Sequence, residues 1–471
     1  MAKYELVVGL ETHIELSTAT KIFCGCSTAF GGEPNTHCCP VCLGLPGALP
    51  RLNRQAIRYG IMAGLATNCQ IQTVSYMDRK NYVYPDLPKA YQNSQFEFPQ
   101  CYGGWIDLAS GKRIRLNRIH VEEDAGKLVH RGGDIYVDCN RGGVPLIEVV
   151  TEPDFRSVEE VREYLEKLQL WVRYLGISDC RMQEGSMRCD VNISIRPVGT
   201  EPFGTRVEIK NMNSFTFIEK AIAYEVERQI DVLESGGSLF QETRRYDETR
   251  DVTEGMRNKE NAMDYRYFRD PDLMRVVVTE EEINELRVAL PEMPEVRAAR
   301  YAETMGLSPA DAALLTRYRR VAEYFEAASD GVTAKTGANF ILGAVFRRLT
   351  TEEEKESAAI TISAEQLREL AALMDAGKLQ MNLAKSALEK MLDKGCGVLD
   401  VVSEADMAGV DAGALESACR DAIAQNESAA QDVRAGKEKA LGALLGAVMR
   451  ATKGAADAGA ARDILLKMLG E

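Results

Sequence analysis

The sequence predicts an α+β protein in which a large mixed β-sheet domain is followed by an all-α helical domain and a small α-helical tail domain. Short segments rich in Val, Ile, Tyr and Thr alternate with Gly and Asn as far as about Leu290, and such segments nearly vanish after it. A chain of 471 residues is also too long for one hydrophobic core. We therefore predict three domains, residues 1–290, 291–402 and 403–471.

Strands of the first domain are predicted where β-branched and aromatic residues lie between turn residues. The predicted strands are 4–16, 113–122, 134–139, 144–150, 190–196, 205–210 and 274–279. Apolar residues at spacings of three and four predict two helices between them, 157–175 and 217–233. Ser157 with Glu160 three residues later indicates a capping box at the start of the first helix.

The segment 289–294 marks the end of the first domain, because two prolines within four residues interrupt regular structure. Beyond it, Ser308 before Pro309 and Ser363 before Gln366 predict helix starts with a capping side chain. The last segment is rich in alanine. Its leucines and valine at helical spacing predict a packed helix: Leu441, Leu444, Leu445 and Val448.

The composition narrows the classes of function. The net charge of −14 argues against a general nucleic-acid binder, because contact with phosphates requires a basic surface, so any RNA contact depends on local patches. No apolar run is long enough for a signal-peptide core or a membrane span. Twelve cysteines without an export signal indicate a reducing compartment, and we expect a cytoplasmic protein that does not contact membranes.

Four cysteines near the N-terminus predict a structural zinc site: Cys24, Cys26, Cys39 and Cys42. They form a C-x-C and a C-x-x-C pair on either side of a loop rich in Gly, Asn and Pro, and two such pairs suit a tetrahedral Zn²⁺. Cys38 could replace Cys39 as a ligand, although the pair formed by Cys39 has the usual spacing. Because all four ligand positions are filled, we expect the zinc to hold a loop and not to catalyse.

A second, oxygen-rich metal site is predicted from carboxylates in unusual surroundings. The alternation of apolar and ionisable residues in 9–16 places Glu11 and His13 on one face of a strand. Glu148 lies within an apolar run, where an unpaired carboxylate is costly, and Glu123 adjoins other acids that repel it. A cation between these four residues explains them together.

Pairing of Glu148 with an arginine such as Arg141 explains its burial equally well. Beside the predicted cation, polar residues from other segments suit phosphate oxygens. They are Arg188, Asp190, Asn192, Lys210 and, on a loop stiffened by proline, Lys80 and Lys89. The chain has no P-loop and no Rossmann fingerprint, so any ATP binds in an unfamiliar way.

Seven segments carry long motifs: Gly9-Leu-Glu-Thr-His-Ile-Glu-Leu, Phe23-Cys-Gly-Cys, Asp78-Arg-Lys-Asn-Tyr, His120-Val-Glu-Glu-Asp-Ala-Gly-Lys, Pro145-Leu-Ile-Glu, Glu184-Gly-Ser-Met-Arg-Cys-Asp and Lys210-Asn-Met-Asn-Ser. Together they resemble the B subunits of the bacterial aspartyl/glutamyl-tRNA amidotransferases. The resemblance covers essentially the whole chain. The archaeal E subunits are similar in the first domain, but they carry a large inserted domain for which this chain has no room.

The resemblance implies a cradle domain with a kinase and amidation site, a helical domain, and a tail that holds tRNA. It implies that ATP phosphorylates the side-chain carboxylate of mischarged Glu-tRNA(Gln), Asp-tRNA(Asn) or both, and that ammonia then displaces the phosphate. This chain has no convincing glutaminase nucleophile. The ammonia therefore comes from a partner, which in the family is the amidase A subunit, and the small C subunit completes a heterotrimer.

The resemblance also assigns residues. A magnesium ion is held by Glu11, His13, Glu123 and Glu148, and manganese would accept the imidazole more readily. Contacts with ATP or the acyl phosphate fall to Arg188, Asp190, Asn192 and Lys210, and contacts with the tRNA end or phosphates to Lys80 and Lys89. The four cysteines match the zinc-containing members. The tail residues that become candidates for contact with tRNA are Lys437, Lys439, Arg450 and Lys453.

Two other functions fit parts of the sequence. One is a zinc-stabilised RNA-binding scaffold whose carboxylates pair with arginines and which performs no ATP chemistry. The other is a metal hydrolase that uses His13, His37 and His120. ATP turnover in the presence of mischarged tRNA and ammonia separates the amidotransferase from the scaffold, and release of a small product without ATP is the test of the hydrolase.

Overall fold

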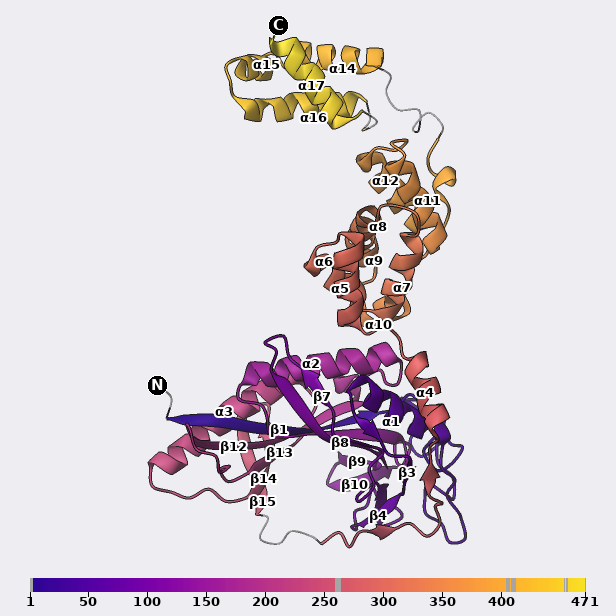
Figure 1. The fold of residues 1–471 in the computed structure, drawn as a ribbon, viewed down its shortest axis with the longest axis vertical. Coiled ribbons are helices and arrows are strands. Elements are labelled where there is room, and N and C mark those ends of the chain that lie inside the picture. Colours follow the sequence, from indigo (N-terminus) through magenta and orange to yellow (C-terminus); the bar gives the residue numbers. More distant parts are fainter. Residues whose placement is uncertain are drawn as a thin grey trace. The chain divides into compact units, whose positions relative to one another are not determined.

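The computed structural model of the chain describes residues 3–258, 264–403, 407, 412–452, 454 and 456–470. The chain forms two compact units, Met1–Pro291 and Glu292–Glu471 (Figure 1). The predicted α+β class is confirmed, because the first unit contains a large mixed sheet and the described elements from α4 (Glu280–Ala289) onward are helices. None of the helices among the described residues is long and apolar enough to cross a membrane.

The large sheet has ten strands in the order β15-β14-β13-β12-β1-β11-β8-β6-β2, and β7 pairs with β8 beside this path. All of its pairs are antiparallel except the parallel pair β13 and β14. The strands are β1 (Tyr4–Glu15), β2 (Gln70–Ile71), β6 (Cys101–Tyr102), β7 (Trp105–Asp107), β8 (Arg113–Glu123), β11 (Pro145–Thr151), β12 (Met187–Pro197), β13 (Val207–Met212), β14 (Glu242–Asp247) and β15 (Val252–Asn258).

Five of the predicted strands correspond to the central strands β1, β8, β11, β12 and β13. The prediction at 134–139 falls on β10 (Asp134–Asp138), which forms a separate hairpin with β9 (Lys127–Arg131). The prediction at 274–279 was too long, because only β17 (Val276–Val277) is a strand there, paired with β3 (Val74–Ser75). A third small sheet consists of β16 (Phe268–Arg269), β4 (Asp78–Asn81) and β5 (Tyr91–Ser94).

Two strands rich in charged residues, the edge strand β15 and its neighbour β14, were not predicted from the sequence. Their polar side chains bind inward to Glu225, which is fully buried on helix α3 (Phe215–Glu234). The Glu225 carboxylate accepts hydrogen bonds from Thr253 Oγ1 at 2.9 Å and from Arg228 Nε at 3.0 Å, and Arg244 Nε lies 3.4 Å from it. A buried network of ion pairs and hydrogen bonds therefore holds these two strands in the sheet, as apolar packing holds the central strands.

One face of the central strands is apolar and packs under helices. Its side chains are fully buried: Val8, Leu10, Ile14, Ile119, Val121, Ile147, Val149, Val191 and Ile193. The covering helices are α1 (Arg54–Ala66), α2 (Val158–Leu175) and α3 (Figure 1). Because side chains alternate along a strand, the intervening residues must all lie on the opposite face, which these helices leave open.

The second helix of this layer begins and ends where the sequence predicts. Ser157 Oγ accepts a hydrogen bond from Glu160 N, and Gly176 ends α2 with a left-handed φ of 71°. The reciprocal half of the capping box differs from the prediction, because the Glu160 carboxylate accepts from the backbone nitrogen of Arg156 instead of Ser157. The other predicted helix, 217–233, is α3 with two further residues at its start and one at its end.

The second unit is helical throughout its described part. Its first helices are α5 (Pro294–Met305), α6 (Pro309–Thr316), α7 (Arg319–Ala328), α8 (Ala334–Phe340), the π-helix η3 (Ile341–Val345), α9 (Phe346–Arg348), α10 (Glu352–Ser357), α11 (Ala364–Asp375), α12 (Met381–Lys394) and η4 (Val398–Asp400). The last ones are α14 (Ala412–Gln425), α15 (Glu427–Arg434), η5 (Glu438–Ala440), α16 (Leu441–Ala451) and α17 (Ala458–Gly470). Ser308 caps α6 and Ser363 caps α11, as predicted.

Buried apolar residues of this unit form two separate clusters, one within residues 301–402 and the other within 415–469. The predicted helix with Leu441, Leu444 and Val448 lies in the second cluster. The division into three domains remains a prediction, because two clusters inside one compact unit do not establish two domains that fold independently.

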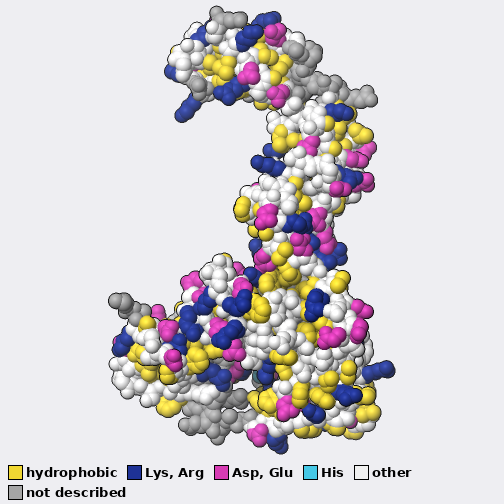
Figure 2. Space-filling model, in the orientation of Figure 1, with side chains coloured by type: hydrophobic (Ala, Val, Ile, Leu, Met, Phe, Trp, Pro, Cys, Tyr) yellow, Lys and Arg dark blue, Asp and Glu magenta, His cyan; other side chains and the backbone are white. Residues whose placement is uncertain are grey.

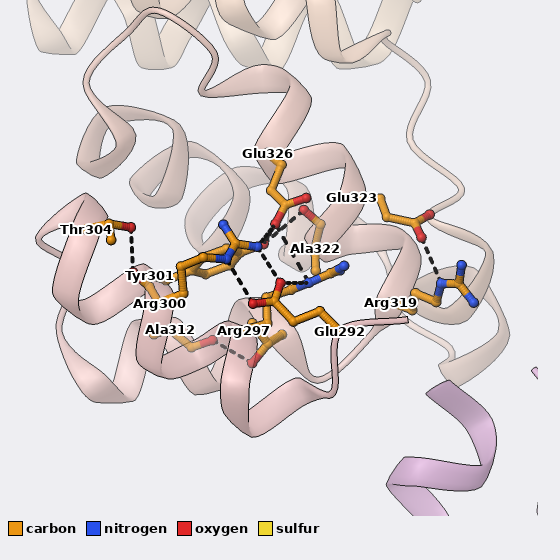
Figure 3. A network of polar contacts seen from close by, with 11 residues as sticks. Glu292, Arg297, Arg300, Tyr301, Thr304, Ala312, Arg319, Ala322, Glu323 and Glu326 are labelled. Carbon is orange, nitrogen blue, oxygen red and sulfur yellow. Dashed lines mark hydrogen bonds and ion pairs between the residues drawn. The ribbon is translucent and has the colours of Figure 1, made fainter. Parts of the chain in front are cut away.

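An ion network stabilises the start of the second unit (Figure 3). Arg300 Nη2 lies 2.5 Å from Glu292 Oε2 and 2.5 Å from Glu326 Oε1, which ties α5 to α7. Arg297, buried beside it, binds Glu292 at 3.3 Å, and the hydroxyl of Tyr301 donates to Glu326 at 3.1 Å. Bidentate arginines in a shared network hold a helix pair more firmly than isolated surface pairs.

Gly60 and Gly64 let α1 approach the sheet closely. A Cβ on Gly64 would collide with Cys101 Sγ and lie 3.0 Å from Cys101 Cβ. We predict that Gly64→Ala lowers the free energy of unfolding of the first unit by about 1–3 kcal/mol, despite the higher helix propensity of alanine. Thermal unfolding followed by tryptophan fluorescence measures it, because both tryptophans, Trp105 and Trp171, lie in that unit.

Gly442→Ala is the matched control, since nothing lies within 4 Å of the position of its Cβ on α16. This substitution should leave the tryptophan transition unchanged. An unchanged transition for Gly64→Ala as well would contradict the close packing of α1 on the sheet.

Candidate functional site

The open face of the central strands carries the predicted site residues. In the antiparallel register, His13 of β1 lies opposite Glu148 of β11 and Arg188 of β12, and Glu148 lies opposite His120 of β8. Glu11 lies opposite Asp190 in the same way. Directly opposite residues share a face, so four neighbouring strands direct ionisable side chains to one place.

Four residues on this face form a histidine–carboxylate cluster: His13, His120, Glu122 and Glu148. The Glu148 Oε2 atom lies 3.5 Å from His13 Nε2 and 3.1 Å from His120 Nε2. Glu122 lies 3.8 Å from His13 Nε2 and 3.5 Å from His120 Nε2. One ligand atom each from His13, Glu122 and Glu148 lie within 4.8 Å of one another, an arrangement that could hold a divalent ion.

The charges in this cluster depend on one another. Burial by itself would lower the pKa of His13 and of His120, but the neighbouring carboxylates outweigh it and raise both pKa values to about 9. Burial would raise the pKa of Glu148, and the charge of His120 with the contact to His13 holds it well below its usual value instead. Glu148 therefore remains ionised, which is the state in which a carboxylate binds metal, whereas a metal ion would bind His13 only by displacing its proton.

The structure does not bring Glu123 to this cluster. It lies on the opposite side of β8 from His120 and Glu122, where its carboxylate binds Lys89 Nζ and accepts a hydrogen bond from Asn93 N at 2.8 Å. The predicted set named Glu123, whereas the structure places Glu122 beside His13 and Glu148. Strand alternation gives the physical reason, since residues two apart share a face and adjacent residues do not.

A lysine–carboxylate cluster adjoins the first: Glu11, Asp190, Glu208 and Lys210. The Lys210 ammonium lies 2.7 Å from Asp190 Oδ2 and 2.6 Å from Glu208 Oε1, and these contacts raise its pKa although burial opposes them. Asn192 Nδ2 donates to Glu11 Oε1 at 2.9 Å. Burial, and then repulsion from Glu148, raise the pKa of Glu11. Glu11 is therefore a carboxylate whose ionised form an added cation would stabilise.

Arginines pair with Asp124 at the end of the cluster. Arg188 Nη2 lies 2.8 Å from Asp124 Oδ2, and Arg141 Nε lies 3.5 Å from the same oxygen. The alternative pairing of Glu148 with Arg141 is therefore not found among the described residues. Burial and the neighbouring Asp124 raise the pKa of Glu15 to about 8. Of these two neighbouring carboxyl groups, Asp124 is therefore the one that loses its proton more readily.

The two predicted lysines of the tyrosine-rich loop have different partners. Lys80 on β4 lies over the rings of Tyr82, at 5.8 Å, and Tyr265, at 5.1 Å. Burial opposes its charge, but Glu122 and other neighbours outweigh burial and raise the pKa of Lys80. Lys89 binds Glu123 and so belongs to the opposite side of β8. Of the two lysines, Lys80 is therefore the one in electrostatic contact with the histidine–carboxylate cluster.

The four predicted cysteines converge. The sulfur atoms of Cys24, Cys26, Cys39 and Cys42 lie within 4.8 Å of one another, and all four residues are half-buried. A hydrogen bond from Cys24 and other contacts lower the pKa of Cys42 to about 4. Cys38 is outside the group, and its sulfur lies 3.9 Å from Asn140 Oδ1. Four soft ligands gathered this closely suit Zn²⁺.

Three of the four predicted tail cations lie in the described part of the chain: Lys437, Lys439 and Arg450. Lys453 lies outside the described residues. Lys437 pairs with Asp432 at 2.9 Å. Lys439 and Arg450 have no carboxylate within ion-pair distance among the residues that the structure describes. The positive charges of Lys439 and Arg450 are therefore less neutralised by neighbouring carboxylates than that of Lys437.

Comparison with known proteins identifies the family. Residues 6–284 match the family described as the GatB/GatE catalytic domain, and residues 323–469 match the family described as the GatB domain. The chain belongs to the GatB family. Among its relatives is the B subunit of the aspartyl/glutamyl-tRNA(Asn/Gln) amidotransferase of Carboxydothermus hydrogenoformans, 49% identical over 475 residues, which cover 99% of this chain and 98% of the relative.

Two further GatB relatives carry the same name. The protein of Caldicellulosiruptor saccharolyticus is 49% identical over 477 residues, with 99% of each chain covered. That of Caldanaerobacter subterraneus is 50% identical over 461 residues, with 97% of each chain covered. The predicted resemblance is confirmed by matches that extend over both units.

Three members of the two clusters were not predicted from the sequence: Glu122, Glu208, and His120 in its role as a partner of Glu148. For His120 and Glu122 a signal was present, because their spacing of two on a predicted strand places them on one face. Glu208 also had a signal, since it is two residues from Lys210 on β13. Neither segment alone shows which of its two faces lies on the same side of the sheet as His13 of β1.

Manganese binding distinguishes Glu122 from Glu123. We predict that Glu122→Gln raises the Kd for Mn²⁺ at least about tenfold, because it removes an oxygen ligand next to His13 and Glu148, and even outer-shell partners contribute that much. The amount of free Mn²⁺, followed by electron paramagnetic resonance, measures it. Glu123→Gln, which makes the same change in charge, should leave the Kd nearly unchanged. Equal losses for both variants would contradict the placement of Glu122.

Proposed function

We propose that this chain is the B subunit of a tRNA-dependent amidotransferase, an ATP-dependent ligase that acts on mischarged Glu-tRNA(Gln), Asp-tRNA(Asn) or both. The convergence of five strands on the two adjoining clusters, in a chain that matches named B subunits over its full length, is the observation that carries the proposal. Mixed carboxylate, imidazole and lysine groups on a sheet face suit phosphoryl transfer, in which positioning and charge supply most of the catalysis.

In the proposed reaction, the side-chain carboxylate of the esterified amino acid attacks the γ-phosphorus of ATP, which releases ADP and leaves an acyl phosphate. Ammonia then attacks the acyl carbon, inorganic phosphate leaves, and the nitrogen loses a proton to give the amide. Lys80 and Lys210 would hold phosphate oxygens by their fixed positive charges. Arg188 and Asn192 border the same face, and Asp190 orients the Lys210 ammonium.

Mg²⁺ or Mn²⁺ fits the histidine–carboxylate cluster, with His13, Glu122 and Glu148 as ligands and Glu11 beside them. Glu123 was the other predicted ligand, and its pairing with Lys89 favours Glu122 in that role. A bound ion would neutralise phosphate charge and orient ATP toward the acceptor carboxylate. The imidazole ligand favours Mn²⁺ over Mg²⁺ when both are available.

Zn²⁺ fits the four cysteines, and its proposed role is structural. The donor set is complete without water, so the ion would fix the loop between the two cysteine pairs and perform no chemistry.

All twelve cysteines are free thiols in the structure, which supports the proposed cytoplasmic location.

The proposed partners are the amidase A subunit, which supplies ammonia, and the small C subunit. The absence of a glutaminase nucleophile from the sequence supports a separate source of ammonia. The tail is the proposed contact for the tRNA body. Figure 2 shows Lys and Arg side chains at several places on the tail among Asp and Glu side chains, so the contact is local and does not reflect the net charge of −14.

Amidation of mischarged tRNA with ammonium as the nitrogen source tests the proposed function without the amidase partner. We predict that Glu148→Gln lowers kcat/KM at least about a hundredfold, because it removes a metal ligand worth several kcal/mol in the transition state. Glu152→Gln is the matched control, since Glu152 follows the same strand and binds Asn117 outside the cluster. A wild-type chain that turns over no ATP with mischarged tRNA and ammonia would instead favour the RNA-binding scaffold.

Binding of labelled tRNA, measured by fluorescence anisotropy, tests the tail. The double variant Lys439→Glu with Arg450→Glu should raise the Kd roughly tenfold and reduce its dependence on salt, because two uncompensated cations are lost. Lys437→Glu should have a smaller effect, since Asp432 already neutralises that ammonium. Unchanged affinity of the double variant would exclude these residues from the contact.

A further inference from the structure

The buried lysine Lys21 lies beside the cysteine group. Its side chain is only 1% exposed, which makes it one of the largest fully buried side chains among the described residues. Its ammonium donates to the backbone oxygen of Cys139 at 3.0 Å and to Cys42 Sγ at 3.8 Å. No Asp or Glu oxygen among the described residues lies within 4.0 Å of Lys21 Nζ. A carbonyl oxygen satisfies one N–H group but cannot balance the charge.

An uncompensated ammonium in a protein interior costs several kcal/mol, so a buried lysine requires an anion. Without a metal, only a Cys42 thiolate would provide a negative charge here. Four thiolates around one Zn²⁺ provide more, because their charge exceeds that of the ion and leaves the centre negative. A Cβ on Gly143 would lie 3.6 Å from Lys21 Cδ, 3.8 Å from Cys42 Cβ and 3.9 Å from Glu123 Oε2, so these three side chains are neighbours. Glu123 is itself paired with Lys89, which leaves the cysteine group as the anion beside Lys21.

We propose that Lys21 is the counter-ion of a zinc–tetrathiolate centre, and that its N–H group binds the sulfur of Cys42 to stabilise this charged form. The inference rests on the zinc site of the proposed function and deepens it. Lys21 binds no metal itself. It is a positioning residue that acts through a ligand, in the way that outer-shell donors act on other metal sites.

Zinc content and zinc release test the proposal. Protein purified without chelator is analysed for metal and then mixed with the chromogenic chelator 4-(2-pyridylazo)resorcinol, whose absorbance reports the released zinc. Lys21→Met should release zinc at least about tenfold faster than the wild type, and Lys21→Arg should release it at nearly the wild-type rate. Lys112→Met is the control, because Lys112 pairs with Glu160 elsewhere in the same unit. Equal release rates for Lys21→Met and the wild type would overturn the proposal.

The melting temperature of the first unit gives a second measurement that separates a counter-ion from an ordinary packing residue. In zinc-loaded protein, Lys21→Met should lower the melting temperature, because the centre loses its compensating charge. In zinc-stripped protein the decrease should be much smaller, because only the sulfur of Cys42 then remains to balance the ammonium. A decrease of the same size in both forms would show that Lys21 contributes packing alone and would overturn the proposal.

The outcomes for the metal and for the lysine are distinguishable. Wild-type protein that contains no zinc refutes both the zinc assignment and the role of Lys21, while the ammonium-dependent amidation assay still decides the catalytic part of the proposed function. Zinc in the wild type with no dependence on Lys21 refutes the counter-ion alone.

Discussion

Compensation of buried charge is the constraint on which the structure of the first unit depends. A strand that lies between two others must bury one face completely, and its alternate residues are then committed to the other face. In the central strands that second face carries carboxylates, imidazoles, lysines and an arginine. A buried ionised group of this kind is costly unless a group of opposite charge lies close to it.

The register of the sheet supplies those partners. Glu148 has a histidine on each side, His13 on β1 and His120 on β8. Asp190 and Glu208 hold Lys210 between them, and Asp124 holds Arg188. Glu148 is thereby kept ionised in a place where it could bind a cation, and Lys210 and Arg188 are fixed in places where each could bind a phosphate.

The same logic appears at positions away from the open face. Glu225 allows two highly charged strands to close the sheet edge, and Glu292 and Glu326 hold α5 against α7 through two arginines. At the cysteine group the proposed anion is a metal centre in place of a carboxylate. Its proposed cation, Lys21, has no Asp or Glu oxygen within ion-pair distance among the described residues. Apolar packing holds the helices against the sheet, and paired charges help to select which strands and helices become neighbours.

The sequence by itself determined the fold class, the central strands, the grouping of the four cysteines and the family, because periodicity, capping residues and long motifs are local properties of the chain. It also determined that Glu11, His13 and Glu148 face a common site. Only the tertiary structure decided between Glu122 and Glu123, paired Arg141 with Asp124 instead of Glu148, and placed Glu208 beside Lys210. Those choices depend on which strand lies next to which and in what register, and a segment read alone contains neither its neighbour nor its alignment. The charged strands β14 and β15 escaped prediction for the same reason, since their partner Glu225 lies on a helix elsewhere in the chain.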